Sequence, residues 1–158
     1  MKKSTIAVIV VLAALGFAVA VLLVLNHADT SARQQLRNDA ILLIVHNDTE
    51  HRLGVADIEA LAPADFEANY NRSGRPAEIR VFTGVPFMAI LERLEIDPAG
   101  VDRAVFAASD GYQSALPVGD LPGVYIALCD ERGPFRMVLP HDQFSQRWVH
   151  WLTDVTLR

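Results

Sequence analysis

The sequence predicts an α+β protein in which a single mixed β-sheet domain with short helices follows one N-terminal transmembrane helix. Residues 6–25 contain no charged or polar side chain, whereas the rest of the chain alternates short apolar runs with turns rich in Gly, Pro, Asp and Asn. One of these runs repeats its apolar residues at helical spacing, and the others are short enough for strands. With 158 residues, the chain is long enough for one such domain and too short for two.

The apolar run of residues 6–25 is interpreted as an uncleaved signal anchor. As a helix rising 1.5 Å per residue, it would span about 30 Å, the thickness of the hydrocarbon core of a bilayer. Lys2 and Lys3 precede the run, so the positive-inside bias keeps the N-terminus cytoplasmic. The protein is therefore predicted to be a single-pass protein of a bacterial inner membrane, with its globular part in the periplasm. A cleaved secretory signal is the alternative, although its apolar region would be shorter, about 7–15 residues.

We divide the chain into an anchor (1–25), a polar stalk (26–40) and a globular domain (41–158).

The charge of the chain limits the classes of partner that the globular domain is expected to bind, and the cysteine content limits its cross-links. The chain holds 14 Lys and Arg against 19 Asp and Glu, and both lysines lie in the anchor. Such an acidic domain argues against nucleic acid as a partner. Cys129 is the one cysteine, which excludes an intramolecular disulfide; within an apparent strand it is interpreted as a small buried hydrophobe.

Two helices are predicted in the globular part. Four apolar residues recur at i, i+3, i+4 and i+7: Phe87, Ile90, Leu91 and Leu94. Thr83 is the expected N-cap, with Pro86 in the first turn, where its missing N–H costs nothing. Because a short amphipathic helix is stable only when its apolar stripe is buried, we expect this helix to pack on the sheet. A second short helix is predicted over 53–61, closed by Pro63.

The remaining apolar runs are predicted to be strands. They are residues 41–45, 65–71, 104–108, 124–128 and 135–139, and a closing strand with Val149, Trp151, Val155 and Leu157 at mostly even spacing. Residues 79–82 lead into the central helix. The loop 109–112 contains Gly111, where a positive φ is expected.

Four segments carry a family resemblance. They are FTGVPF (82–87), SDGYQSALP (109–117), GPFRMVLP (133–140) and RWVHWL (147–152). In this order and spacing they resemble the molybdopterin-binding domain of sulfite-oxidase-type oxidoreductases, most of all the small stand-alone bacterial members. The resemblance covers about two thirds of the chain, from Leu53 to Arg158. It implies a reduced sulfite-oxidase-like fold, in which helix 53–61 matches the short helix that precedes the core.

The resemblance also implies roles for individual residues. In this family a cysteine thiolate, upstream of the FTGVPF-like segment, binds the metal; here the matching residues 65–80 contain no cysteine, and Cys129 cannot be carried over. Arg147 matches the arginine that meets the pterin phosphate, and His150 stands at the position of the accompanying lysine. Arg136 matches the arginine of the GP-x-R piece, either as an anion contact, as an ion-pair partner or as an exposed residue on a sheet face.

Other side chains are weaker candidates. Asp110 and Tyr112 either line the former cofactor cleft or shape a turn. Trp148 and Trp151 are interpreted as a packing feature. The five histidines show no spacing typical of a metal site and are interpreted as surface residues. The chain contains no G-x-S-x-G, Walker or H-E-x-x-H motif.

These observations predict a non-catalytic binding or accessory subunit of a membrane complex or signalling system. Its expected partner is an integral membrane or periplasmic protein, or a small anionic ligand. The expected cleft residues are Asp110, Tyr112, Arg136, Arg147 and His150, and no cofactor or metal is expected. Two alternatives remain open: a molybdopterin-dependent oxidoreductase with a site that lacks cysteine, and a purely structural stalk protein.

Overall fold

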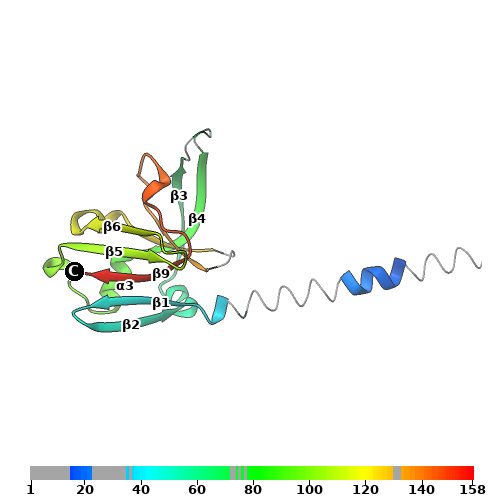
Figure 1. Ribbon diagram of the computed structural model, residues 1–158, viewed down its shortest axis with the longest axis horizontal. Helices are drawn as coiled ribbons and strands as arrows, with labels where there is room; N and C mark the ends of the chain where they lie inside the picture. Colours follow the sequence, from blue (N-terminus) through cyan, green and yellow to red (C-terminus); the bar gives the residue numbers. More distant parts are fainter. Residues whose placement is uncertain are drawn as a thin grey trace, which may run out of the picture. The chain divides into compact units, whose positions relative to one another are not determined.

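A computed structural model describes residues 15–22, 35, 37–71, 74, 76, 78–129 and 133–158 of the chain (Figure 1). Within these residues the fold is α+β, with short helices and two β-sheets, of five and four strands. The predicted α+β class is confirmed. The prediction of one sheet is wrong, because the hairpin that precedes the central helix pairs with a later hairpin and not with the strands before and after it.

The five-stranded sheet has the order β2-β1-β9-β5-β6. Its strands are β1 (Ile41–His46), β2 (Thr49–Gly54), β5 (Arg103–Ala108), β6 (Gln113–Pro117) and β9 (Leu152–Leu157). Only the pair β1–β9 is parallel, so this sheet is mixed. Figure 1 shows β9, the C-terminal strand, inserted between β1 and β5.

Strands β2 and β6 lie at the two edges of this sheet, and neither was expected from the sequence. β6 exposes every second residue, and β2 is almost wholly polar, with only Leu53 buried. The turn into β2 is formed by Asn47 and Asp48, both at positive φ (49° and 60°), as two-residue hairpin turns require. Edge strands need no continuous apolar run, which is why the pattern of these two was missed.

The four-stranded sheet is antiparallel, in the order β3-β4-β7-β8. It comprises β3 (Ala64–Tyr70), β4 (Glu78–Pro86), β7 (Tyr125–Leu128) and β8 (Phe135–Val138). After β8 the chain turns back across this sheet: the carbonyl of Pro140 accepts a bond from Asn69 N (3.4 Å), and Val149 forms a bridge with Met137. The segment between β8 and β9 therefore contacts both edge strands of this sheet, β3 and β8.

Helix α3 (Phe87–Arg93) is the predicted central helix, with Phe87, Ile90 and Leu91 buried. Its N-cap is Pro86 and not Thr83. That prediction is wrong because β4 continues through Thr83, whose hydroxyl donates instead to Asp65 Oδ1 at 2.6 Å.

Helix α2 (Val55–Glu59) is shorter than the predicted helix over 53–61. Leu53 belongs to β2, where it pairs with Leu42. The helix begins after Gly54, whose N–H donates to Asp57 Oδ2 at 2.7 Å and so ends the strand. Three short 3₁₀ helices complete the described elements: η1 (Pro98–Gly100), η2 (Val118–Gly123) and η3 (Ser145–Arg147).

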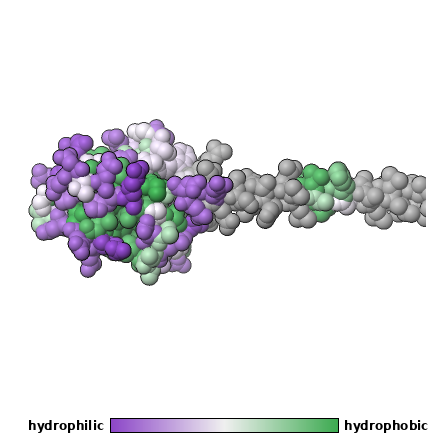
Figure 2. Space-filling model, turned by 90° about the horizontal axis from the view of Figure 1, so that it is seen from below, coloured by the Kyte–Doolittle hydropathy of each residue, from purple (hydrophilic) through white to green (hydrophobic). Residues whose placement is uncertain are grey.

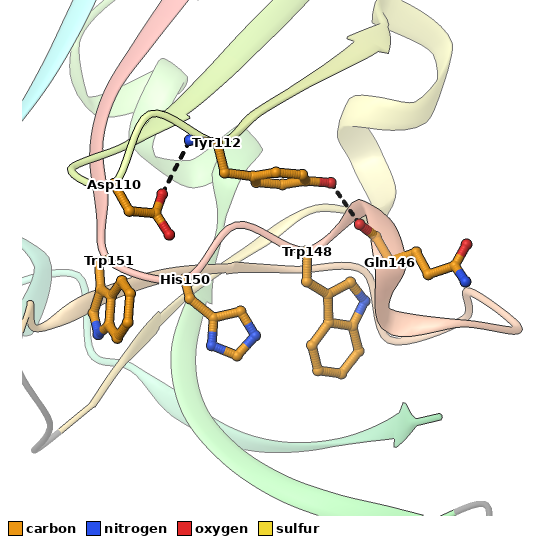
Figure 3. A pocket seen from close by; sticks show the side chains of 6 residues that line it. All are labelled: Asp110, Tyr112, Gln146, Trp148, His150 and Trp151. Atoms are coloured by element: carbon orange, nitrogen blue, oxygen red, sulfur yellow. Dashed lines mark hydrogen bonds between the residues drawn. The ribbon is translucent and has the colours of Figure 1, made fainter. Parts of the chain in front are cut away.

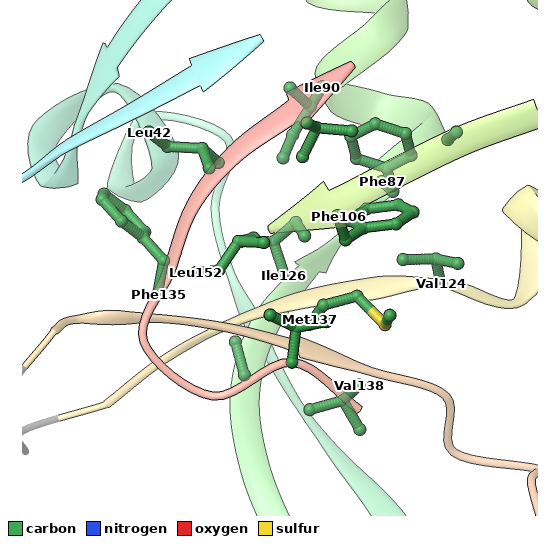
Figure 4. Packing of buried hydrophobic residues seen from close by; sticks show 14 of the residues in the cluster. Leu42, Phe87, Ile90, Phe106, Val124, Ile126, Phe135, Met137, Val138 and Leu152 are labelled. Carbon is green, nitrogen blue, oxygen red and sulfur yellow. The ribbon is translucent and has the colours of Figure 1, made fainter. Parts of the chain in front are cut away.

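The core lies between the two sheets and α3 (Figure 4). Phe87 of α3 meets Phe106 of β5 edge to face, with ring centroids 5.2 Å apart. Ile126 and Phe135 add the inner face of the four-stranded sheet, and Leu42 adds β1. The predicted packing of the helix on a sheet is thus confirmed.

A β-bulge in β9 explains why the prediction for Trp151 in the closing strand is wrong. Ala107 pairs with Asp154 and Ala108 with Leu152, so Thr153 is an extra residue in β9. The bulge shifts the inward-facing positions by one, and Leu152 rather than Trp151 enters the core. Trp151 was predicted to belong to the closing strand and to be a packing feature; it instead precedes β9, is 39% exposed and has φ +52°.

The chain divides into two compact units, 1–35 and 36–158. In the first, residues 15–22 are helical, and their apolar side chains are exposed and hydrophobic in Figure 2. The rest of the predicted anchor, and most of the predicted stalk, lie outside the described residues. Within the stretches that the structure describes, no helix combines the length and apolar character needed to cross a membrane.

Candidate functional site

A hollow of about 310 Å³ lies at the end of the β5–β6 hairpin (Figure 3). It is lined by one acid, one imidazole, one amide and three aromatic side chains: Asp110, Tyr112, Gln146, Trp148, His150 and Trp151. Asp110 and Tyr112 come from the turn between β5 and β6, and the other four come from η3 and the segment before β9. Segments more than thirty residues apart in sequence therefore form the two walls.

The first wall is a tight turn held by its own hydrogen bonds. Ala108 N donates to Tyr112 O (2.9 Å), and Gly111, at φ +89°, donates its N–H to Ala108 O (3.0 Å). Asp110 Oδ1 accepts the N–H of Tyr112 at 3.0 Å. The positive φ predicted for Gly111 is confirmed. Asp110 both shapes the turn and lines the hollow, so the two alternative roles are compatible.

The second wall is tied to the first by two contacts. The hydroxyl of Tyr112 donates to the carbonyl of Gln146 at 2.5 Å, and Ser109 N donates to the carbonyl of Trp151 at 3.0 Å. Figure 3 shows Trp151 and Tyr112 on either side of Asp110, with His150 below it, between Trp151 and Trp148. Because both bonds join backbone carbonyls of one wall to the other, the width of the hollow is set by the fold.

Trp148 anchors the second wall in the core. It is 2% exposed, and the centroid of its ring lies 5.6 Å from the ring centroids of both Tyr70 and Phe82. Its Nε1 donates to the carbonyl of Leu139 at 3.2 Å. The predicted packing role fits Trp148. It does not fit Trp151, which is exposed at the mouth of the hollow.

Gly133 lies directly against Trp151. Its φ of +83° is strained for other residues, and a Cβ at this position would lie 3.0 Å from Trp151 Cδ1. The glycine of the GPFRMVLP segment therefore lets the backbone approach an aromatic wall of the hollow. This is a structural reason for a glycine that the resemblance alone leaves unexplained.

Arg147 is adjacent to the lining residues in sequence but directs its guanidinium elsewhere. Nε and Nη2 donate to Asp142 (2.9 and 2.5 Å), and Nη1 donates to Asp120 of η2 at 2.8 Å. These two carboxylates raise the pKa of Arg147 further above its usual value, Asp142 more than Asp120. The arginine thus fastens η3 to η2, and with its two acids it carries a net charge of −1.

Replacing Arg147 by glutamine is expected to lower the free energy of unfolding by about 1 kcal/mol or less, because both ion pairs are near the surface, where solvent weakens them. The side chain of Arg147 is 46% exposed. Urea denaturation followed by circular dichroism measures this change, with Asp142→Asn as the matched variant from the other side of the pair. A loss of about 3 kcal/mol or more would contradict the assignment to a surface clamp.

Arg136 is also separated from the hollow. It lies in β8, is 7% exposed, and its guanidinium carbon is 5.7 Å from the ring centroid of Phe82. Of the five residues expected in one cleft, the structure thus brings together Asp110, Tyr112 and His150, and it places both arginines outside the lining.

The sequence did not mark Gln146, Trp148 and Trp151 as lining residues. No local signal marks Gln146, because its backbone carbonyl makes the contact with Tyr112. Cys129 directly follows β7, is half-buried and does not line the hollow. Among the described residues, no three His, Cys, Asp or Glu side chains gather closely enough to hold a metal ion.

Comparison with known proteins adds no assignment: no family model matches this chain, and no curated protein matches it.

Proposed function

We propose that this chain is a non-catalytic binding module, and that the hollow between the β5–β6 turn and η3 is its ligand site. The observation that carries this proposal is the make-up of the lining: three aromatic side chains around one carboxylate and one imidazole. Concave sites of this kind, mostly apolar with a few polar groups, are where proteins bind small molecules. None of the lining side chains is a serine, threonine, cysteine or lysine, which are common nucleophiles of covalent catalysis.

The resemblance to sulfite-oxidase-type domains supports one shared site for its segments. The segment 109–117 forms the turn wall of the hollow, and 147–152 forms most of the other wall. The segment 133–140 places Gly133 behind Trp151, and 82–87 joins β4 to α3. We propose on this basis that the domain is a reduced member of that fold type.

Molybdopterin, which the resemblance implies, does not fit the residues present. None of the lining residues is a cysteine, so the hollow has no thiolate for the metal. Arg147, the residue expected to meet the pterin phosphate, holds two carboxylates with its guanidinium. Asp110 adds a further negative charge at the site where an anionic group would have to bind. We therefore derive no reaction through this cofactor.

The proposal includes a membrane tether and a partner. The apolar side chains of residues 15–22 are exposed, and such a surface is stable in lipid rather than in water. We propose that residues 6–25 hold the domain at the periplasmic face of the inner membrane, as part of a membrane complex or signalling system. An integral membrane or periplasmic protein is the proposed partner.

Metal and pterin analysis of the full chain tests this function. The chain is expected to stay in carbonate-washed membranes, because the apolar run is embedded in lipid. After extraction in detergent it is expected to show neither stoichiometric molybdenum nor the visible absorption of a metal–pterin centre. Expression in a host that loads a known molybdopterin enzyme is the control. Stoichiometric molybdenum in this chain would contradict the proposal and favour the oxidoreductase alternative.

A further inference from the structure

The polar groups of two lining rings are already used within the protein. The Tyr112 hydroxyl donates to the carbonyl of Gln146, and Trp148 Nε1 donates to the carbonyl of Leu139. The donors of Tyr112 and Trp148 are therefore already used and do not serve an anion. The exposed face of the Tyr112 ring, which carries the negative end of the aromatic quadrupole, remains for a ligand.

The charged side chains near the hollow also favour a cation as the ligand. Asp110 uses Oδ1 for the N–H of Tyr112, and Figure 3 shows its second oxygen turned towards the hollow. The cluster of Arg147, Asp142 and Asp120 adds a net charge of −1 beside η3. The chain as a whole carries −5. The expectation of an anionic ligand rested on two arginines, and neither lines the hollow.

The two most accessible rings flank this carboxylate. Tyr112 is 43% exposed and Trp151 is 39% exposed, although both are large aromatic residues. A cation within about 6 Å of an aromatic centroid is attracted to the ring face, most strongly for Trp. Two rings on either side of a carboxylate therefore provide both contacts that an organic ammonium group uses.

The size of the hollow limits the ligand. Its volume of about 310 Å³ is at the lower end of the range for small-molecule sites. We propose that the hollow binds an organic ammonium group, preferably a methylated one, held by the faces of Trp151 and Tyr112 and by the carboxylate of Asp110. This inference rests on the proposed function and names the ligand class of the same site.

Tryptophan fluorescence gives a direct measurement, because the chain has only two tryptophans and both line the hollow. The full chain is titrated with tetramethylammonium chloride in a non-ionic maltoside detergent. Phosphocholine detergents are avoided because their head group itself contains a trimethylammonium group. We expect a saturable change in emission. Sodium chloride at equal ionic strength, and 2,2-dimethylpropanol as an uncharged compound of similar shape, are expected to give none.

Four variants test which residues act. Asp110→Asn removes the charge and is expected to weaken binding about tenfold; Trp151→Ala is expected to weaken it at least fivefold, with Trp148 left as the reporter. Glu67→Gln removes an exposed acid of β3, and Phe144→Ala removes an exposed ring; both lie outside the lining and are expected to bind like the unaltered chain. Circular dichroism confirms that each variant is folded.

The possible outcomes distinguish a failure of this inference from a failure of the proposed function. Saturable binding of phosphate and not of tetramethylammonium would overturn the cationic class and leave a binding module. Binding of neither would overturn the inference, while the metal and pterin analysis would still decide between a binding module and an oxidoreductase. Equal weakening by Glu67→Gln would also overturn it, because binding would then follow bulk charge. A trimethyllysine peptide that binds tighter than tetramethylammonium would support the inference and identify a protein as the source of the ammonium group.

Discussion

Replacing Trp148 by alanine is expected to lower the free energy of unfolding by about 4 kcal/mol, the largest effect of any substitution considered for this domain. The side chain is 2% exposed and lies against both Tyr70 and Phe82. Its removal leaves a cavity under the segment between β8 and β9, and it removes one of the two donors to the carbonyl of Leu139, which keeps the N–H of Asp142. Because small domains are stable by only about 5–15 kcal/mol, much of the molecule would be unfolded at moderate urea.

Trp151→Ala is the matched control for this prediction. The residue type is the same and the sequence neighbourhood is shared, but Trp151 is 39% exposed. We expect it to cost about 1 kcal/mol or less, as exposed substitutions usually do. Urea denaturation followed by far-ultraviolet circular dichroism compares the two variants. Equal losses would contradict the distinction between a buried anchor and an exposed ligand wall.

Replacing Gly84 by alanine is expected to lower the free energy of unfolding by about 3 kcal/mol. Gly84 lies opposite Ala127 in the β4–β7 pair, and a Cβ there would be 2.4 Å from the carbonyl oxygen of Ile126 and 2.7 Å from Ala127 Cα. Both are backbone atoms, so they cannot move aside as a flexible side chain would. The strand pair would have to separate, at the point where β4 leads into α3.

Gly119→Ala is the control, since a Cβ at Gly119 meets nothing within 4 Å. It is expected to change the free energy of unfolding by about 0.5 kcal/mol at most. Thermal and urea unfolding of the two alanine variants give the comparison. If Gly84→Ala were as stable as Gly119→Ala, the close approach of β4 and β7 would be wrong. The glycine of FTGVPF would then need a reason other than packing.

Local patterns predicted the parts of the fold that depend on neighbours in sequence. Helix α3 follows from the spacing of Phe87, Ile90 and Leu91, because a helix places such residues on one face wherever it occurs. The turn at Gly111 follows from Asp-Gly chemistry in the same way. The partners of each strand depend on contacts across the whole chain. The division into two sheets was therefore beyond what periodicity could predict.

The site illustrates the same limit. Asp110 and Tyr112 were expected near a cleft because a resemblance marked their segment, and they do line the hollow. Arg147 was expected in the cleft but does not line the hollow, because its guanidinium is paired with two acids. One of them, Asp120, is 27 residues away in sequence, and no local pattern predicts an ion pair over that separation. Trp151 was missed because a single extra residue in β9 turned it from the core to the hollow.

We propose that the chain binds its ligand in this hollow. Amide chemical-shift mapping of the ¹⁵N-labelled full chain in maltoside micelles, titrated with tetramethylammonium, locates the binding site residue by residue. We predict that the largest shifts fall at residues 108–112 and 146–151, the two walls of the hollow. Shifts concentrated on the β3–β4 hairpin or on α2, with these two segments unchanged, would contradict it.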